Sequence, residues 1–229
     1  TGASSGIGEE VARVLAAEGA HTVLVARSAE KLEALADAIR AAGGQATVLP
    51  CDLSDPASVD ALVAAVDALG GCDVLVNNAG RSIRRAVQDA RFHDFERTMQ
   101  LNYFGAMRLI LGFLPGMRAR GRGQVVNVLS MGLQTRVPRY AAYIASKAAL
   151  EAASASIAAE VLHEGVHFTA VYMPLVRTPM IAPSELYRTW PALEVGEAAA
   201  MVSRAIVERP PRVSTPLGSM SATWALLAP

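Results

Sequence analysis

The residues TGASSGIGEEVARVLAAEGAHTVLVAR, at positions 1–27, contain the pattern that decides the fold. A glycine-rich turn, Thr1 to Gly8, runs directly into a helical pattern, and a short β-branched run, His21 to Arg27, follows. Turns of this kind normally follow a strand, and the free N–H groups of the next helix then point at a phosphate group. The stretch therefore predicts a pyrophosphate-binding turn between a strand and a helix.

The three glycines of this turn have separate expected roles. Gly2 permits a tight turn, Gly6 lets the backbone approach a ligand, and Gly8 lets the helix pack closely. The same residues also spell G-x-S-x-G, the nucleophile elbow of α/β-hydrolases. A hydrolase would need an acid and then a histidine later in the chain, and it would leave the other motifs unexplained, so we favour the phosphate-binding interpretation.

Strands and helices alternate along the rest of the chain. Strands are expected at 46–55, 72–80, 123–130, 166–180 and 212–216, and helices at 28–42, 55–69, 93–120, 141–165 and 194–208. Asp55 followed by Pro56 is a well-formed helix start, and Gly43 with Gly44 ends the preceding helix. This alternation predicts an α/β fold with a doubly wound parallel sheet.

Composition narrows the function to small-molecule chemistry in one domain, residues 1–229. Lys plus Arg and Asp plus Glu balance at 21 each, so no basic surplus indicates nucleic acid or an anionic membrane. No apolar run reaches the roughly 18 to 20 residues of an integral membrane segment. Cys51 and Cys72 are too few and too far apart for a disulfide framework, and we interpret both as small core residues. We expect a soluble, cytoplasmic protein.

The segment SMGLQTRVPRYAAYIASK, Ser130 to Lys147, carries the expected chemistry. Ser130 ends a predicted strand, and Tyr143 and Lys147 are four residues apart, so they share one face of a helix. A tyrosine phenol titrates near pH 10, and an ammonium one turn away would stabilise its phenolate. We interpret Tyr143 as an acid/base tuned by Lys147, although Y-x-x-x-K also occurs by chance on amphipathic helices.

Two residues at strand ends indicate the cofactor. Arg27 stands where an acidic residue would bind the ribose 2′-hydroxyl of NAD, and an arginine there accommodates a 2′-phosphate, so the sequence favours NADP. The alternative for Arg27 is an ordinary surface cation at a helix start. Asp52 follows the next strand, at the edge where open α/β sheets bind ligands, and is a candidate adenine contact.

Asparagines mark two further positions. CDVLVNNAG, Cys72 to Gly80, is a buried strand that ends in polar amides and a glycine, which leave room for a flat ligand. Asn102 lies near the middle of the helix expected at 93–120, where asparagine has poor propensity. Its alternative interpretation is an exposed helical asparagine.

One metal motif is rejected. His163, Glu164 and His167 spell H-E-x-x-H, the signature of zinc proteases. A zinc site needs both histidines on one helical face, but Gly165 more plausibly ends the helix and His167 opens a strand. We expect no metal site.

Together these motifs resemble the short-chain dehydrogenase/reductase family. TGASSGIG, CDLSD, NNAG, Asn102, and Ser130 with Tyr143 and Lys147 follow in order and at matching spacing over nearly the whole chain. The resemblance implies a single Rossmann-type domain and a nicotinamide cofactor. It implies that Tyr143 is the catalytic acid/base, that Ser130 holds the substrate carbonyl, that Lys147 binds the nicotinamide ribose, and that Asn102 supports a proton-relay water.

The same resemblance implies the cofactor contacts. They are Gly2, Ser4, Ser5, Gly6, Ile7, Gly8, Arg27, Asp52, Leu53, Asn78, Ala79, Gly80, Tyr143, Lys147, Pro174, Val176 and Thr178. The chain departs from the family at Leu175, where the family usually has glycine after the proline, and this raises a question about the local backbone.

A narrower resemblance concerns the substrate. NNAGRSIRR, NYFGAMRL and MPLVRTPMIAP are similar to the bacterial fatty acyl-CoA reductases of this family, which use NADPH to reduce acyl thioesters. Arg81, Arg84 and Arg85 would suit the CoA phosphates, although a loop arginine cluster is more often a solvated face. The segment 181–193 combines apolar and aromatic residues with prolines, as a lid over an acyl chain would. A ketone, steroid or alcohol dehydrogenase and a non-catalytic NADPH sensor are the alternatives.

The resemblance also sets expectations for the ends of the chain and for self-association. The family's first strand should precede Thr1 and occupy the centre of the sheet, so two strands are expected to be unpaired on their inner edges. We interpret residues 1–229 as truncated at both ends, with SATWALLAP, residues 221–229, as a shortened helix. The alanine-rich helix at 141–165 has the small residues of a subunit interface, which suits a homo-oligomer.

Overall fold

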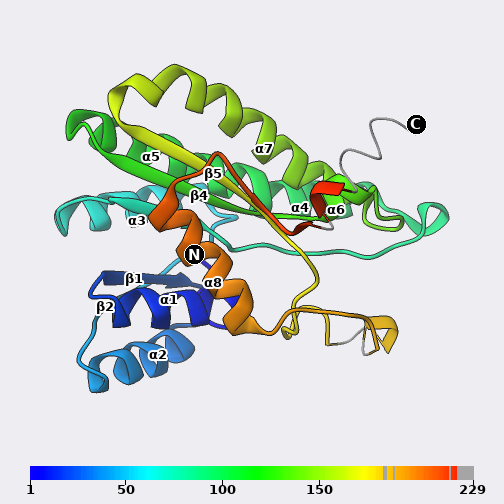
Figure 1. Cartoon of the computed structure of the whole chain (residues 1–229), viewed down its shortest axis with the longest axis horizontal. Coiled ribbons are helices and arrows are strands. Elements are labelled where there is room, and N and C mark those ends of the chain that lie inside the picture. Colours follow the sequence, from blue (N-terminus) through cyan, green and yellow to red (C-terminus); the bar gives the residue numbers. More distant parts are fainter. Residues whose placement is uncertain (183–184, 188, 217, 221–229) are drawn as a thin grey trace.

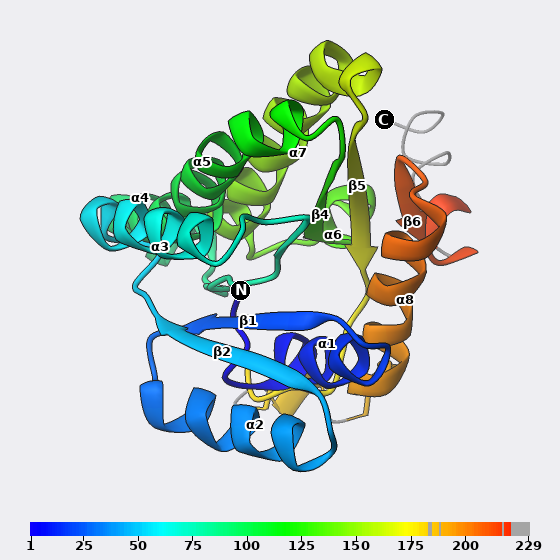
Figure 2. The same ribbon diagram turned by 90° about the vertical axis from the view of Figure 1, so that its left-hand side faces the viewer.

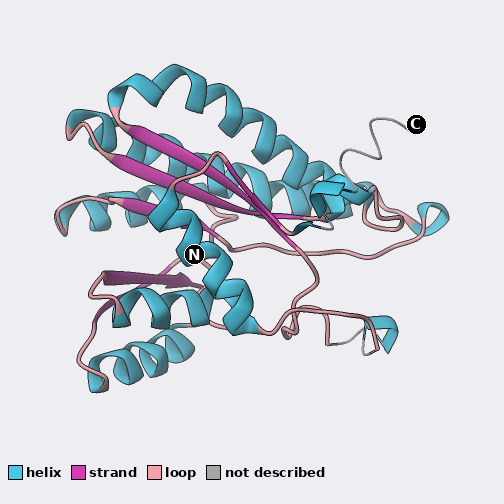
Figure 3. Ribbon diagram, viewed as in Figure 1, coloured by secondary structure: helices cyan, strands magenta, loops and turns pink. Residues whose placement is uncertain are grey.

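Parallel strands form the middle of the structure, as the alternating pattern predicts. The structure is a computed structural model that describes residues 1–182, 185–187, 189–216 and 218–220. Its strands are β1 His21–Ala26, β2 Gln45–Pro50, β3 Val74–Asn77, β4 Gly123–Ser130, β5 Val166–Met173 and β6 Arg212–Ser214. Each predicted strand is present, and the strand pairs in the described part of the chain are parallel. Figure 3 shows the strands between layers of helix.

Helices connect the strands and cover both faces of the sheets. The helices are α1 Gly6–Ala17, α2 Ala29–Ala41, α3 Pro56–Ala68, α4 Phe92–Met99, α5 Ala106–Ala119, α6 Gly132–Thr135, α7 Ala141–Val161 and α8 Val195–Glu208. Short 3-10 helices, η1 Val87–Asp89, η3 Leu162–Glu164 and η4 Glu185–Tyr187, lie in the connections, and η2 Gln100–Gly105 is a π-helix. The fold is therefore the doubly wound α/β arrangement that the sequence predicts (Figure 1).

The described strands form two separate sheets. Strands β1 and β2 pair with each other, and β3, β4, β5 and β6 form a second sheet in that order. The first residues of the chain lie between the two: the Thr1 amino group donates to the Val76 carbonyl at 3.0 Å, and the Ala3 N–H donates to the Val25 carbonyl at 3.2 Å. Figure 2 shows the N-terminus between the two sheets. The expected separation of the strands is confirmed.

Apolar side chains fill both sides of the strands. One core cluster joins α3, α5 and α7 to β3, β4 and β5, with Leu109, Ile110 and Met117 fully buried. A second cluster joins α1 and α8 to the opposite side of β4 and β5. A third packs α2 against β1 through the predicted stripe Leu32, Leu35 and Ile39. These three clusters hold the carboxyl ends of the strands at one edge, where the polar motifs lie.

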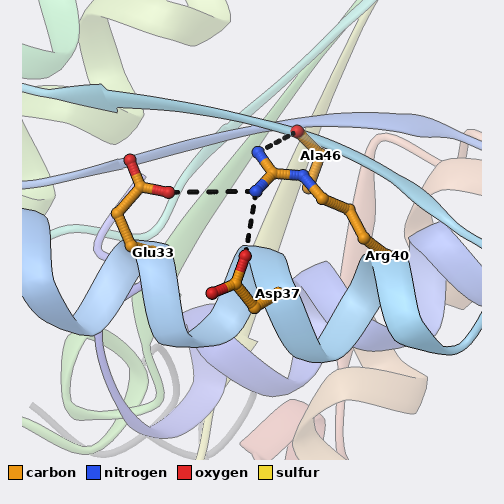
Figure 4. Close-up of polar contacts among 4 residues, drawn as sticks. All are labelled: Glu33, Asp37, Arg40 and Ala46. Carbon is orange, nitrogen blue, oxygen red and sulfur yellow. Dashed lines mark hydrogen bonds and ion pairs between the residues drawn. The ribbon is translucent and has the colours of Figure 1, made fainter.

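Helix ends follow the predicted signals. Asp55 caps α3 by accepting from the N–H groups of Ala57 and Ser58, each at 3.3 Å, and Pro56 is the first helical residue. Arg40 near the end of α2 donates to the Ala46 carbonyl of β2 at 2.9 Å and lies 3.1 Å from Asp37 and 3.9 Å from Glu33 (Figure 4). Exposed ion pairs of this kind contribute about 0 to 1 kcal/mol, so the backbone contact matters more for holding α2 on β2.

The helix predicted at 93–120 is interrupted. It begins at Phe92 and ends at Ala119, but residues 100–105 form the π-helix η2 between α4 and α5. A π-helix inserts one residue into the helical turn and so re-aims its side chains, which is why such turns often occur at functional sites. The prediction of one regular helix is therefore wrong at this point.

Some expectations lie outside the described residues. The helix expected at 221–229 and positions 183, 184 and 188 of the expected lid belong to this group. Among the residues that the structure describes, no helix has the length and hydropathy required to cross a membrane.

Candidate active site

Ser130, Tyr143 and Lys147 come together where β4 ends and α7 begins. Ser130 is the last residue of β4, and Tyr143 and Lys147 lie in the first two turns of α7. The Ser130 Oγ accepts from the Gly132 N–H at 3.1 Å and hydrogen-bonds the Tyr143 phenol. With one lone pair of Oγ occupied by Gly132, the Ser130 hydroxyl keeps its proton and one lone pair for Tyr143 or a ligand oxygen.

Tyr143 keeps its proton at neutral pH. Burial raises the pKa of the Tyr143 phenol above its ordinary value of 10, and the hydrogen bond with Ser130 opposes this rise. Tyr143 as a residue is half-buried, so part of it is accessible to a ligand. A protonated phenol with a stabilised oxygen is the form that can donate a proton to a reacting carbonyl.

Lys147 is buried against the backbone of β4. Its side chain is 3% exposed, and its Nζ donates to the Val128 carbonyl at 2.7 Å. Burial lowers the pKa of the Lys147 ammonium to about 8, because the charged form loses its hydration. The lysine therefore carries its charge at neutral pH and loses it within the range where enzymes operate.

Asn102 lies at the centre of a buried hydrogen-bond network. It is 1% exposed, so the alternative of an exposed helical asparagine is wrong. Its Oδ1 accepts from the Arg81 N–H at 2.7 Å, and its Nδ2 donates to the Arg81 carbonyl at 2.9 Å and to the Ser146 Oγ at 3.0 Å. The Ser146 hydroxyl donates to the Tyr143 carbonyl at 2.7 Å. The asparagine thus joins the loop after β3 to the first turns of α7.

The NNAG segment lies against Asn102 and Lys147. A Cβ built at Gly80 would lie 3.4 Å from the Asn102 Oδ1 and 3.6 Å from the Lys147 Nζ. The Asn78 Nδ2 donates to the Thr1 carbonyl at 2.9 Å, and the Ala79 N–H donates to the Thr1 hydroxyl at 3.0 Å. The segment therefore connects the glycine-rich turn to the candidate catalytic residues.

The glycine-rich turn requires its glycines. Gly2 and Gly6 have φ values of +68° and +60°, the left-handed region that favours glycine. A Cβ at Gly8 would lie 2.4 Å from the Gly2 carbonyl oxygen, which no side chain tolerates. Ser5 precedes α1 without a side-chain cap hydrogen bond, so the first N–H groups of α1, from Gly6 onward, are available to an anion.

Three charged residues gather at the far end of this edge. Arg27 directly follows β1 and is exposed, and Asp52 lies two residues after β2. Hydrogen bonds from the Ser54 hydroxyl at 2.6 Å and the Ser54 N–H at 2.9 Å lower the pKa of the Asp52 carboxyl, and the charges of Arg27 and Arg81 act in the same direction. Arg81 therefore lies on the side of Arg27. Leu53 is 6% exposed, so its side chain belongs to the core.

The loop after β5 returns over the glycine-rich turn. A Cβ at Gly6 would lie 3.1 Å from the Thr178 Cγ2. The Leu193 N–H donates to the Leu175 carbonyl at 2.8 Å, and the Arg177 N–H donates to the Leu193 carbonyl at 2.9 Å. Pro174 is half-buried, and Val176 between these two bonds is 4% exposed. Among the described residues the non-glycines with positive φ are Arg136, Arg139 and Arg209, so Leu175 needs no left-handed backbone.

The two histidines of the rejected zinc motif lie in different elements, as the sequence predicts. His163 lies in η3, Gly165 ends that turn with a φ of +77°, and His167 lies in β5, so the two histidines do not share a helical face. His21 is the first residue of β1 and hydrogen-bonds the Thr47 hydroxyl at 2.8 Å. Cys51 and Cys72 are free thiols whose pKa values burial raises, the latter to about 12.

Sequence reasoning missed two features of the site. Ser146 is fully buried between Asn102 and Tyr143, and its position directly before Lys147 was the available signal. Tyr140 packs edge-on against Tyr143 with 6.3 Å between ring centroids, and its hydroxyl hydrogen-bonds that of Tyr187. No sequence motif connects residues so far apart in the chain.

Comparison with known proteins identifies the family. The model of the short chain dehydrogenase family matches residues 1–187. A fatty acyl-CoA reductase of Acinetobacter baylyi is 52% identical over 235 residues, which cover 100% of this chain and 79% of that protein. A fatty acyl-CoA reductase of Mycobacterium tuberculosis is 49% identical over 218 residues, covering 93% of this chain and 74% of that protein.

A solved structure agrees with the same assignment. A short-chain dehydrogenase from Sphingobium yanoikuyae in complex with NADPH superposes with a TM-score of 0.89 and 29% identity, covering 99% of this chain and 89% of that one. The family match, the relatives and the fold together show that this chain is an oxidoreductase of the short-chain dehydrogenase/reductase family.

Proposed function

We propose that the protein reduces a carbonyl group with NADPH, and that Ser130, Tyr143 and Lys147 perform the proton chemistry. The observation that carries the proposal is their convergence at one edge of the sheet. Ser130 is oriented by Gly132, Tyr143 is protonated and half-buried, and Lys147 is held against β4. The NNAG segment joins this group to a turn built for phosphate.

The residues present fit a nicotinamide dinucleotide phosphate. The turn at Gly2, Gly6 and Gly8 leaves no room for side chains where a pyrophosphate would approach. Arg27 would hold the 2′-phosphate, Asp52 the adenosine, and Lys147 the nicotinamide ribose. The NADPH complex of the structurally similar Sphingobium protein supports this choice. When bound, the cofactor supplies the hydride.

The protein's own side chains supply the remaining steps. Ser130 would donate a hydrogen bond to the carbonyl oxygen, and Tyr143 would donate a hydrogen bond and then its proton. Donors fixed before the reaction stabilise the negative charge as it develops on that oxygen. The Lys147 ammonium would favour the phenolate that remains after proton transfer, and the Asn102 network would hold the helix that carries both residues.

We further propose a fatty acyl-CoA as the substrate. Reduction places a hydride on the thioester carbon and a proton on its oxygen, after which the C–S bond breaks and releases an aldehyde and free CoA thiol. The names of the Acinetobacter and Mycobacterium relatives support this choice. Aromatic residues of the loop after β5, among them Tyr187 and Trp190, would cover an acyl chain, and the loop arginines would meet the phosphates. Reduction of a simple ketone, steroid or alcohol-derived carbonyl is the second candidate.

A non-catalytic NADPH sensor is the rival from another class. A sensor needs the phosphate turn but not an oriented serine beside a protonated phenol. Following the absorbance of NADPH with a panel of carbonyl compounds separates the two, because a sensor would bind NADPH and oxidise none.

The variant Tyr143→Phe tests the proposed chemistry. In the full-length protein, it removes the donated proton and leaves the ring packing with Tyr140 in place. We expect turnover to fall by at least about 10²-fold to 10⁴-fold, with the Kd for NADPH unchanged. Retained turnover would contradict the assignment of Tyr143.

A further inference from the structure

A hollow lined by arginines lies beside the active site. We call it the arginine hollow: a depression of about 710 Å³ whose lining includes Arg84, Arg85, Arg91, Arg139 and Asp89. The first three arginines and Asp89 belong to the segment between β3 and α4, and Arg139 comes just before α7. The two segments are joined by the Arg85 N–H, which donates to the Arg139 carbonyl at 2.8 Å. The hollow is therefore built from distant parts of the chain.

The arginines of the hollow have two different roles. Arg85 lies 2.6 Å from Asp94, whose side chain is 5% exposed, so this pair neutralises itself and fixes the loop. Arg84, Arg91 and Arg139 are exposed, and within the described ranges none of them has an ion-pair partner. Three cations against the carboxylate of Asp89 give the hollow a surplus of positive charge.

Arg139 is held in a backbone conformation that arginine seldom adopts. Its φ is +71°, in the left-handed region, which costs a non-glycine residue about 1 kcal/mol or more. The hydrogen bond from Arg85 holds its carbonyl in this position. A glycine or asparagine would fit this backbone more easily, so the position places a guanidinium at the hollow at some cost to stability.

The hollow is one aromatic ring away from Tyr143. Tyr140 packs edge-on against Tyr143, at 6.3 Å between centroids. Burial and the hydrogen bond with Tyr187 raise the pKa of the Tyr140 phenol, and the charge of Arg84 opposes this rise, so Arg84 lies near Tyr140. A ligand whose carbonyl lies at Tyr143 could extend past Tyr140 to the hollow.

The cofactor phosphates are expected at a different place. We expect them at the glycine-rich turn and Arg27. Arg81 belongs with this group: burial is the main cause that lowers the pKa of its guanidinium, and the charges of Arg97 and Arg27 lower it further, so Arg27 lies near Arg81. Arg81 is not part of the lining of the hollow. The cations of the hollow therefore suit an anionic group on the substrate, and guanidinium groups bind phosphate in a bidentate manner.

We propose that the arginine hollow binds the phosphates of the CoA part of an acyl-CoA, with Arg84, Arg91 and Arg139 as the contacting cations. The proposal rests on the proposed function, because it assumes a thioester carbonyl at Ser130 and Tyr143. A volume of about 710 Å³ lies within the roughly 300 to 1,000 Å³ typical of small-molecule sites. Of the three arginines expected to meet CoA, Arg84 and Arg85 line the hollow, and Arg81 is assigned to the cofactor side.

Direct binding of free CoA tests the hollow without requiring turnover. Isothermal titration compares the wild-type protein with the double variant Arg84→Ala, Arg91→Ala and with the single variant Arg139→Gly, which keeps the left-handed backbone. Arg122→Ala is the matched control, because Arg122 is an exposed arginine just before β4, at the end of that strand opposite Ser130. We expect the double variant to raise the Kd for CoA at least about tenfold and the control to leave it unchanged.

Kinetics with two thioesters separate the hollow from the reaction. A long-chain acyl-CoA and the same acyl group on N-acetylcysteamine share the carbonyl, but the second lacks phosphates. The double variant should lower kcat/KM at least about tenfold for acyl-CoA and leave kcat/KM for the phosphate-free thioester and KM for NADPH within about twofold.

The outcomes distinguish the two failures. Absence of CoA binding to the wild-type protein, or equal CoA binding by wild type and double variant, would overturn the hollow as the CoA site. A parallel fall for both thioesters would also overturn it, because the arginines would then act on the fold. CoA binding that the double variant loses, without reduction of either thioester, would support the hollow and refute the proposed reaction. If the variant lost reduction of an acyl carrier protein thioester while its CoA affinity stayed unchanged, the hollow would instead bind a carrier protein.

Discussion

Tyr140 neighbours both the proposed catalytic corner and the arginine hollow, and these two regions are built in opposite ways. Lys147 and Asn102 are almost fully buried, and each makes a hydrogen bond to backbone. Arg84, Arg91 and Arg139 are exposed cations at the surface. Hydrogen bonds hold the side chains of the first region in one arrangement. The arginine side chains of the second region are exposed, and a bound anion could order them. Under the proposed function, the difference means that the reaction and the choice of substrate depend on separate parts of this molecule.

Apart from Tyr143, the largest expected effect belongs to Ser130. Ser130→Ala removes a fixed donor to the developing oxyanion, so we expect kcat to fall about 10²-fold to 10³-fold. It also removes the hydrogen bond that opposes the rise in the Tyr143 pKa. Steady-state kinetics measure the first effect, with the Kd for NADPH and the Tm as controls. A Ser130→Ala variant with wild-type kcat would contradict the proposal that a fixed Ser130 hydroxyl stabilises the oxyanion.

The next effect concerns the buried network around Asn102. Asn102→Ala leaves the Arg81 backbone and the Ser146 hydroxyl without their partner, and we expect the free energy of unfolding to fall by about 2 to 4 kcal/mol. Gln100→Ala is the matched control in the same π-helix, because Gln100 makes a single bond to the Ser54 carbonyl at 3.0 Å. Chemical denaturation measures both variants. Equal losses would show that Asn102 has no special role in holding the loop.

Cofactor choice should change with one exposed residue. If Arg27 binds the 2′-phosphate, its charge-assisted hydrogen bonds should favour NADPH over NADH by about 1.5 to 3 kcal/mol. Arg27→Asp should reverse this preference, while Arg122→Ala should not change it. Fluorescence titration with both cofactors measures the ratio of Kd values. Equal affinity of the wild-type protein for the two cofactors would contradict the role of Arg27.

The smallest expected effect is the response of Lys147 to pH. Its pKa is about 8 when folded, against an ordinary value of 10.5, so the unfolded chain binds more protons between these values. Stability should therefore rise by about 1 kcal/mol from pH 8 to pH 9 because of this group. The rate of reduction should fall over the same range as the ammonium loses its charge.

The titration can be observed directly because the chain has two lysines, Lys31 and Lys147. Carbon-13 labelling of lysine gives two side-chain signals, and Lys31→Arg assigns them. A Lys147 signal that titrates at or above 10.5 would show that burial does not depress its pKa.

Much of the fold was predictable because its signals are local. Asp55 and Pro56 define the start of α3, and the turn at Gly2 to Gly8 requires glycine for steric reasons. The order of Ser130, Tyr143 and Lys147 was likewise visible as spacing. The π-helix was not predictable, because QLNYFG at 100–105 contains no residue that breaks a regular helix before its final glycine.

The arginine hollow was only partly predictable. Arg81, Arg84 and Arg85 were grouped because they are close in sequence, but the loop between them directs Arg81 toward Arg27 and the other two toward the hollow. Arg139 reaches the hollow through a backbone hydrogen bond that no spacing rule describes. Sequence proximity grouped the three arginines, and the tertiary structure places Arg84 and Arg85, but not Arg81, in the lining of the hollow.

The most direct test of the central claim is the stoichiometry of thiol release. NADPH consumption and free thiol are measured together while the full-length protein acts on a long-chain acyl-CoA, with Tyr143→Phe as the inactive control. Reduction to the aldehyde predicts one thiol for each NADPH consumed, and two NADPH for each thiol if the aldehyde is reduced further. Consumption of NADPH with a fatty aldehyde or a ketone, but no thiol from acyl-CoA, would contradict the claim and identify a simple carbonyl reductase.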